Sequence, residues 1–295
     1  MVSRAIATEI SAGNGAGPDS DYVYLDLTHL GAETIKKKLP DITDFVRTYV
    51  KIEPIEEPIP VQPTAHYAMG GIPTDVHSRV LSDEKGTVLP GVYAAGEAAC
   101  VSVHGANRLG TNSLLDIVVF GKRAGQSMVD YVTQTKPNTI SDSASDDLSK
   151  KIQNLIDKEH TDEFSVANIR KDLQESMEEN AKIFRTKETL EKQTEILEEL
   201  RERYENVTIF DKSKVHNSEL VEAIELDYLL DMSEATVASA LARNESRGAH
   251  SRQDFPDRDD TNFMKHSFAF KKDNSANLKY KDVELGKYEP MERKY

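Results

Sequence analysis

The stretch GVYAAGEAACVSVHGANRLGTNSLLDIVVFGKRAG, residues 91–125, sets a glycine-rich polar loop between two apolar runs. Residues 91–98 are apolar and end in small side chains, which predicts a short strand. Residues 112–132 begin with an Asn/Ser cap and are apolar on nearly every side, which predicts a buried helix. This order of elements indicates an α/β domain whose polar loop residues gather at the mouth of the helix.

Two side chains and the helix start in this stretch have a chemical interpretation. Glu97 ends a strand, where a carboxylate can accept hydrogen bonds from ribose hydroxyls; a surface or capping carboxylate is an equal alternative. Arg108 lies between two glycines and can hold a carboxylate through two parallel hydrogen bonds, although an isolated arginine is usually part of a structural salt bridge. The helix start at residue 112 or 113 offers backbone N–H groups to an anion. Together they indicate a site for an anionic ligand and a cofactor.

Two further motifs lie outside the stretch. His66 in AHYAMGG precedes two glycines, which let the backbone approach a ligand closely. A lone histidine is more often structural, but the proline-stiffened approach and the glycine pair favour a hydrogen-bond donor to a carboxylate or carbonyl. GNGAG, residues 13–17, has no preceding strand and no third glycine at the sixth position, so it predicts a turn rather than a dinucleotide site.

Composition excludes several classes of function. A formal net charge of −14 over 295 residues argues against nucleic acid as the main partner, because binding phosphates needs concentrated Lys and Arg. The single cysteine, Cys100, excludes an internal disulfide and a cysteine-based metal site. No run approaches the roughly 20 apolar residues that span a bilayer.

The chain is expected to be α/β at first and all-α later. Residues 22–27 alternate like a strand, and residues 31–50 have helical spacing that is broken at Pro40. A proline-rich extended segment follows, then a hairpin around residues 82–87. The polar segment 133–147 is the best candidate for a domain boundary, and beyond it apolar stripes predict a helical bundle. The stripes are Ile169, Leu173 and Met177; Leu190, Leu197 and Tyr204; and Leu220, Ile224 and Leu241.

Three long stretches resemble the FAD-dependent succinate dehydrogenase/fumarate reductase flavoprotein family. They are EPIPVQPTAHYAMGGIPTD, the stretch 91–125 and ESRGAHSRQDFPDRDD. The resemblance runs from Val2 to Tyr295, and Tyr295 resembles the natural C-terminal residue of the family. It implies the C-terminal part of an FAD-binding α/β domain with a capping-domain segment, followed by a helical bundle and an irregular tail. The implied divisions are a capping-domain segment (1–60), the C-terminal part of the FAD-binding domain (61–132), a linker (133–147), a helical domain (148–244) and a tail (245–295). The Arg and Asp residues of the tail are interpreted as structural ion pairs.

The resemblance also implies FAD as cofactor and assigns residues by matching positions. Glu97 resembles the FAD-binding glutamate, and Ser113 with Leu114 resembles the backbone pair beside the flavin ring. His66 and Arg108 resemble two ligands of the substrate carboxylates.

The resemblance leaves the catalytic role unfilled. The proton-transferring arginine of the family falls before Met1, so Arg4 is not given that role and no catalytic residue is assigned. The chain therefore resembles the C-terminal half of the subunit, a fragment. It lacks half of the FAD site, and alone it is expected to be inactive.

Residue differences favour succinate dehydrogenase within the family. Fumarate reductase flavoproteins tend to have GGIETD and NSLAE where this chain has GGIPTD and NSLLD. L-Aspartate oxidases usually have Cys at the position of Met69 and Glu at that of Asp116. A fumarate reductase flavoprotein and a non-catalytic remnant or assembly module are the alternatives.

The resemblance further implies partners and a location. Succinate and fumarate would be the ligands, and an iron–sulfur subunit and membrane anchor subunits would be the protein partners. Membrane contact is expected only through those partners. The location would be the cytoplasmic face of the inner (plasma) membrane in a bacterium, or the matrix side of the mitochondrial membrane in a eukaryote.

Overall fold

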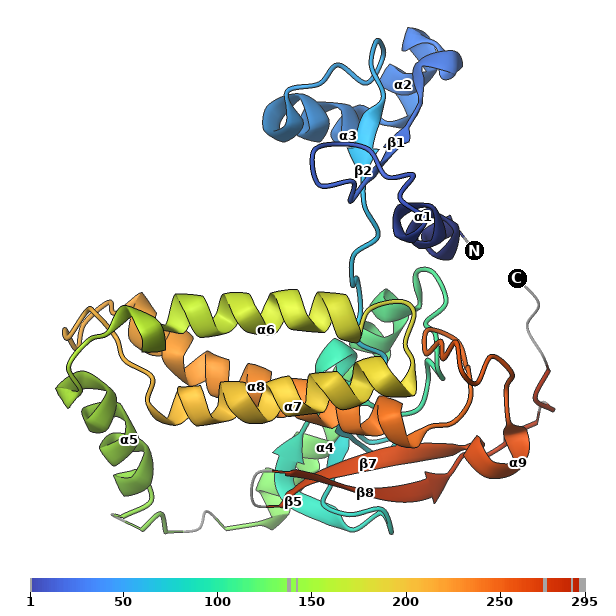
Figure 1. Cartoon of the computed structure of the whole chain (residues 1–295). Coiled ribbons are helices and arrows are strands. Elements are labelled where there is room, and N and C mark those ends of the chain that lie inside the picture. The colour runs from blue at the N-terminus through green and yellow to red at the C-terminus, as the bar shows by residue number, and fades with distance from the viewer. Residues whose placement is uncertain (1, 137–138, 142, 273–274, 288, 292–295) are drawn as a thin grey trace. The chain divides into compact units, whose positions relative to one another are not determined.

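The computed structural model describes residues 2–136, 139–141, 143–272, 275–287 and 289–291; Tyr295, the expected natural end, lies outside these ranges. The chain forms two compact units (Figure 1), which divide between Tyr67 and Ala68. The expected domain bounds, including the one at residues 60 and 61, stay predictions. The polar segment 133–147 lies inside the second unit and does not separate the two units.

The first unit is a small α/β fold. Its strands β1 and β2 pair antiparallel, with Val23 opposite Val61. Pro40 interrupts the expected helix by starting a new one, as its fixed φ and missing N–H favour. Ile35 of α2 and Val46 of the following helical turn are among its buried apolar side chains. The elements are α1 Val2–Ser11, β1 Val23–Leu25, α2 Ala32–Lys38, α3 Pro40–Phe45, a π-helical turn Val46–Val50 and β2 Ile59–Val61.

The second unit begins with short strands and one long helix. Strands β4 and β5 form the predicted hairpin around residues 82–87, and β3 runs parallel to β6. A turn of 3₁₀-helix, Gly96–Ala98, joins β5 to β6 and contacts α4. The elements are β3 Ile72–Pro73, β4 Arg79–Leu81, β5 Val88–Tyr93, β6 Ala99–Cys100 and α4 Asn112–Gln134.

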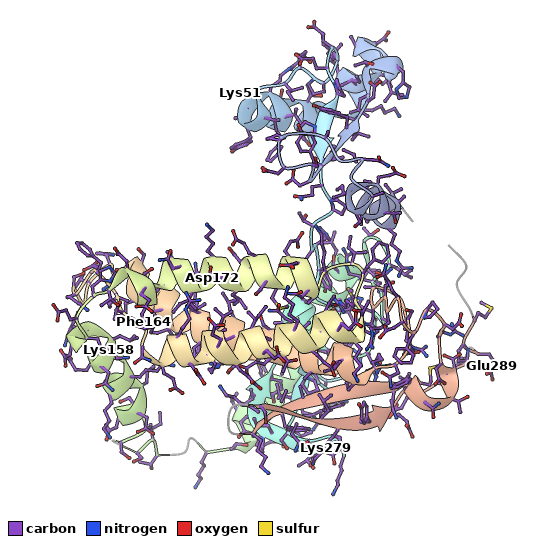
Figure 2. All side chains as sticks on the ribbon, viewed as in Figure 1. Lys51, Lys158, Phe164, Asp172, Lys279 and Glu289 are labelled. Carbon is purple, nitrogen blue, oxygen red and sulfur yellow. The ribbon has the colours of Figure 1, made fainter. Side chains whose placement is uncertain are left out.

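A helical bundle follows and contains the largest core of the chain. All three predicted apolar stripes lie in this core or pack against it, and side chains fill the space between α6 and α7 (Figure 2). Side-chain caps start three of the helices: Ser165, Thr186 and Asn217 each accept a hydrogen bond from a backbone N–H of the first turn. The helices are α5 Asp146–Asp157, α6 Val166–Asn180, α7 Lys187–Glu205 and α8 Ser218–Ala242. Within the described ranges, no helix is both long and apolar enough to cross a bilayer.

The tail is more regular than expected. After the short helix α9 Asp260–Phe263, strands β7 Lys265–Lys272 and β8 Ser275–Asp282 form an antiparallel ribbon that packs on α8. The expectation of an irregular tail was therefore wrong for this segment. The signal was an alternation of aromatic and small or polar residues in SFAFKK, which is typical of a half-buried strand.

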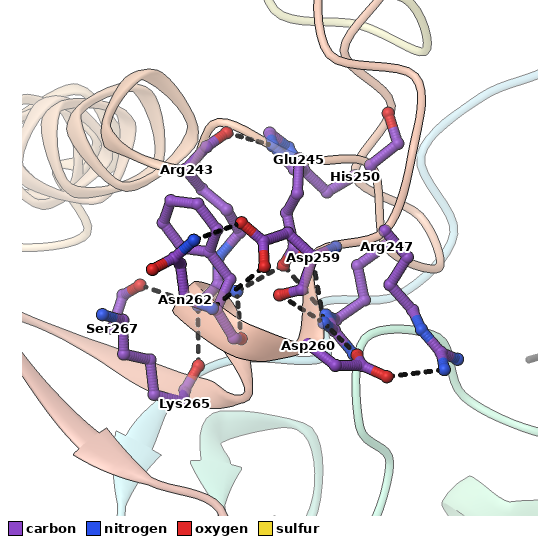
Figure 3. A network of polar contacts seen from close by, with 12 residues as sticks. Arg243, Glu245, Arg247, His250, Asp259, Asp260, Asn262, Lys265 and Ser267 are labelled. Carbon is purple, nitrogen blue, oxygen red and sulfur yellow. Dashed lines mark hydrogen bonds and ion pairs between the residues drawn. The ribbon is translucent and has the colours of Figure 1, made fainter. Parts of the chain in front are cut away.

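The start of the tail is a dense network of ion pairs (Figure 3). The fully buried Glu245 accepts hydrogen bonds from Arg243 Nη1 at 2.7 Å and from Arg247 Nε at 2.8 Å. Arg247 also binds Asp260, at 2.7 Å. Nearby, Arg252 is 1% exposed and forms its own pair with a carboxylate. The structural interpretation of the charged tail is thus confirmed.

Unfolding at mildly acidic pH should report on His250. Burial lowers the pKa of His250 from 6.5 to about 4, so the unfolded chain binds a proton that the folded chain rejects. The stability contributed by the unprotonated ring is therefore complete above pH 6.5 and is lost as the pH falls towards 4. Urea unfolding between pH 7 and pH 5 should show falling stability. His250→Gln should flatten this slope, and an unchanged slope would contradict the assignment.

Candidate functional site

Residues 101–111 form the loop that carries Arg108, between β6 and α4. Ser102 and Thr111 near its two ends have positive φ, 72° and 67°, in the left-handed region that is unfavourable for non-glycine residues. Contacts elsewhere must hold this conformation. Those contacts come from α4 on one side and from the tail on the other.

On the α4 side, a buried histidine holds the loop. His104 Nε2 lies 2.9 Å from Asp116 Oδ2, and the two side chains are 5% and 3% exposed. Asn112 Nδ2 lies 3.4 Å from His104 Nδ1. The imidazole is therefore held between the carboxylate of Asp116 and the side-chain amide of Asn112. His104 and Asn112 thus fix the loop to the first turns of the helix.

Arg108 and Ser113 are brought together. Arg108 Nη1 donates to Ser113 Oγ at 3.3 Å and to the carbonyl oxygen of Leu109 at 3.3 Å. Both Arg108 and Ser113 are half-buried. The structure therefore places the guanidinium beside the amino-terminal end of α4, where the helix dipole is positive.

The start of α4 differs from the expected Asn/Ser cap. The cap position is Thr111, whose side chain makes no capping hydrogen bond. Asn112 and Ser113 lie inside the helix, and their side chains bind His104 and Arg108 instead. A helix start without a side-chain cap suits an anion or developing negative charge.

The expectation that α4 is buried was wrong. Among its described residues only Asp116 and Ala124 are buried, whereas Leu114 is 62% exposed and Val118 is 70% exposed. An all-apolar pattern predicts that a helix face needs a cover, but it does not identify the cover. Here the described residues of the chain leave much of the apolar surface open.

Glu97 lies on the exposed turn that follows β5. Its Oε1 accepts the N–H of Ala68 at 2.9 Å, which orients the carboxylate. Gly96 before it has a φ of 76°, and a Cβ at that position would lie 3.0 Å from Ile117 of α4. The turn therefore packs closely on the helix and holds Glu97 in a fixed place.

His66 and Arg4 belong to the first unit. His66 is exposed, on an extended segment one residue before the end of that unit, and Arg4 lies in α1. Of the five predicted site residues, Arg108, Ser113, Leu114 and Glu97 belong to the second unit. Their relation to His66 stays a prediction.

Cys100 lies just before the loop, on β6. Burial raises the pKa of the Cys100 thiol although a hydrogen bond from the backbone of Ser102 opposes it, and a raised pKa disfavours a reactive thiolate. Across the described ranges, no group of three or more His, Cys, Asp or Glu side chains is arranged to hold a metal ion.

Two contacts between the loop and the tail were missed by sequence reasoning. The carbonyl of Ala106 accepts the N–H of Ala249 at 2.9 Å, and Ser102 Oγ lies 2.9 Å from His266 Nε2. The segment ESRGAH carries part of the family resemblance, but its residue pattern does not indicate that its glycine contacts a loop so far upstream in the sequence.

Two family models match the chain. An FAD binding domain matches residues 1–114, and a model described as fumarate reductase flavoprotein C-term matches residues 170–295. The two models together cover most of the first unit, the loop with Arg108, the bundle and the tail.

Relatives span twice the length of this chain. The succinate dehydrogenase flavoprotein subunit of Rickettsia bellii is 44% identical over 274 residues, which is 91% of this chain and 46% of that protein. The fumarate reductase flavoprotein subunit of Escherichia coli is 40% identical over 300 residues, 100% of this chain and 48% of that protein. A structure of Escherichia coli quinol fumarate reductase is similar with a TM-score of 0.89 at 38% identity, over 99% of this chain and 49% of that one. The chain thus spans about half the length of the curated relatives it matches.

Proposed function

The chain belongs to the family of succinate dehydrogenase and fumarate reductase flavoproteins, and we propose that it is the C-terminal half of such a subunit and forms one wall of a site that oxidises succinate to fumarate. FAD is the cofactor of this family. When bound, it would take the hydride from one methylene carbon of succinate, while the proton from the neighbouring carbon would pass to a residue outside those assigned in this chain. The residues of this chain would bind and orient both the substrate and the cofactor.

The observation that carries the proposal is the position of Arg108 beside the start of α4. Arginine can grip a carboxylate through two parallel hydrogen bonds, and the contact with Ser113 Oγ directs the guanidinium. The helix start adds a positive dipole end at the same place. We propose that Arg108 and His66 hold the substrate carboxylates, because a dicarboxylate needs a cationic or hydrogen-bonding partner at each end.

The residues proposed for FAD fit such a group. Glu97 is exposed and already oriented by the N–H of Ala68, so its carboxylate can accept hydrogen bonds from ribose hydroxyls. We propose that the backbone of Ser113 and Leu114 lies beside the flavin ring, at a helix start that has no side-chain cap. In this structure the N–H of Leu114 donates to the carbonyl of Thr111 at 3.1 Å. Negative charge that develops there on reduction would be stabilised by the helix dipole.

The direction of the reaction is a finer proposal. Succinate dehydrogenase relatives are 41–45% identical to this chain and fumarate reductase relatives are 40–42% identical, so overall identity does not separate the two. The GGIPTD and NSLLD segments are what favour the dehydrogenase. We therefore propose succinate oxidation as the physiological direction, with fumarate reduction as the alternative.

Partners and location follow from the same premise. We propose that an iron–sulfur subunit receives the electrons and passes them to quinone, and that membrane anchor subunits hold the complex. The protein would then lie peripherally at the cytoplasmic face of the inner membrane in a bacterium, or at the matrix side in a eukaryote.

Flavin binding should depend on the matching half of a relative. We expect the 295-residue chain, produced alone, to purify without flavin. Produced together with the amino-terminal half of the Rickettsia bellii relative, it should retain FAD. Succinate should then bleach the flavin absorbance near 450 nm, because the dicarboxylate site is complete.

The same preparation separates the alternatives. Faster dye reduction by succinate than dye-driven reduction of fumarate supports the dehydrogenase, and the reverse ratio supports the reductase. Flavin that stays oxidised with succinate would refute the proposed oxidation. A complex that forms without ever retaining flavin would instead support a non-catalytic binding module.

A further inference from the structure

The tail touches the loop with Arg108 backbone to backbone. The N–H of Ala249 donates to the carbonyl of Ala106 at 2.9 Å. Gly248 beside it has a φ of 59°, and a Cβ added there would lie 2.4 Å from the carbonyl oxygen of Ala106 and 2.6 Å from its carbonyl carbon. No side chain fits at such a distance, so only glycine allows this approach.

The turn that presents Gly248 is held firmly. Arg247 and His250 exchange both backbone hydrogen bonds, at 2.8 and 3.0 Å. The guanidinium of Arg247 is fixed in turn by the buried Glu245 and by Asp260 (Figure 3). The turn is therefore a rigid support rather than a loose end that could adapt to the loop.

A second contact holds the other end of the loop. Ser102 Oγ lies 2.9 Å from Nε2 of His266, which is on β7. Ser102 is one of the two non-glycine residues with strained, left-handed backbone near the loop ends. The tail thus contacts the loop both at its start and two residues before Arg108.

We propose that the turn Arg247–His250 positions Arg108, with Gly248 as the positioning residue and His266 as a second support. This inference rests on the proposed function, because it gives Arg108 a substrate to hold. Ala106 lies two residues before Arg108, so displacement of its carbonyl moves the guanidinium. A misplacement of about 1 Å can lower catalytic efficiency by up to about 10²-fold, and here the loss should fall mainly on substrate binding, since hydrogen bonds to a carboxylate are directional.

Gly248→Ala tests the proposal in the FAD-loaded protein. The new Cβ should displace the loop and raise KM for succinate by about tenfold or more, with a smaller change in kcat per bound flavin. Gly86→Ala is the matched control. Gly86 also has a positive φ, 88°, but an added Cβ there meets nothing within 4 Å, so KM should stay unchanged.

The KM readout separates positioning from a loss of folding. A variant that merely unfolds in part lowers the amount of holoenzyme but leaves KM of the folded fraction unchanged. If Gly248→Ala lowers only the flavin content, or changes KM no more than Gly86→Ala does, the positioning role is refuted.

A milder pair of variants covers the case in which Gly248→Ala does not fold. His266→Phe removes the bond to Ser102 while keeping a ring in place, and His266→Gln keeps a hydrogen-bonding group. We expect KM for succinate to rise several-fold in His266→Phe and to be rescued in His266→Gln. Equal KM values in the two variants would contradict the second support.

Hydrogen exchange distinguishes this inference from the proposed function. The amides of residues 103–110 should exchange faster in Gly248→Ala than in Gly86→Ala, whether or not succinate is the substrate. Wild-type protein that fails to oxidise succinate refutes the proposed function. The exchange comparison then still tests whether the turn Arg247–His250 supports the loop. Equal exchange in the two variants refutes the support itself.

Discussion

Replacing Arg108 by glutamine in the FAD-loaded protein is expected to lower kcat/KM for succinate by about 10²- to 10³-fold. Glutamine keeps a hydrogen-bond donor but loses the charge and the planar fork that match a carboxylate. Since a carboxylate loses its water when it enters the site, the missing cation leaves it without a charged partner. Steady-state dye reduction at varied succinate concentration measures the effect.

Arg123 of α4 supplies the control. Its Nη1 donates to the carbonyl of Val76 at 2.9 Å, on the surface and outside the proposed site. Arg123→Gln should therefore change kcat/KM by less than about twofold, in line with the small energies of exposed polar contacts. Comparable losses in Arg108→Gln and Arg123→Gln would show that Arg108 does not hold substrate.

Replacing Glu245 by glutamine should destabilise the second unit by about 3–5 kcal/mol, because two arginines would lose a buried charged partner. Glu245 is fully buried and binds Arg243, Arg247 and the N–H of Asp259. Burial by itself would raise the pKa of Glu245, but the hydrogen bonds from these groups outweigh it and lower the pKa. Urea unfolding at pH 7 measures the loss.

The ionised form of Glu245 sets the pH dependence of this effect. Because its folded pKa lies below the usual 4.5, its contribution is complete above that pH and fades as the pH falls further. Glu222→Gln is the control, since the side chain of Glu222 is 48% exposed and lies 3.5 Å from Arg170. This control should cost less than about 1 kcal/mol. A similar cost for both variants would refute the role of burial.

Sequence patterns predicted the elements well where one period dominates. The stripe of Ile169, Leu173 and Met177 repeats at helical spacing, and it forms part of the bundle core. Pro40 was expected to interrupt a helix, and it does so because it has no N–H to donate. Local rules sufficed in these cases, since each depends only on residues a few positions apart.

The rest depended on contacts between distant segments. His104 and Asp116 are recognisable as partners only once the loop folds back on α4. The exposure of Val118 also could not be predicted, because the apolar pattern of a helix does not indicate which other residues, if any, pack against it. Gly248 is the strongest example, since the close contact that leaves no room for a side chain there is made with Ala106, far away in the sequence.

The contact between Ala106 and Ala249 also has a consequence for biosynthesis. A ribosome completes the loop with Arg108 long before it reaches the tail, and the whole helical bundle lies between them in the sequence. The nascent chain can therefore bury its bundle core while the Arg108 loop still lacks its partner. The proposed binding of the dicarboxylate should therefore develop late in folding. It requires that the turn Arg247–His250 has left the exit tunnel and has contacted Ala106, far upstream in the sequence.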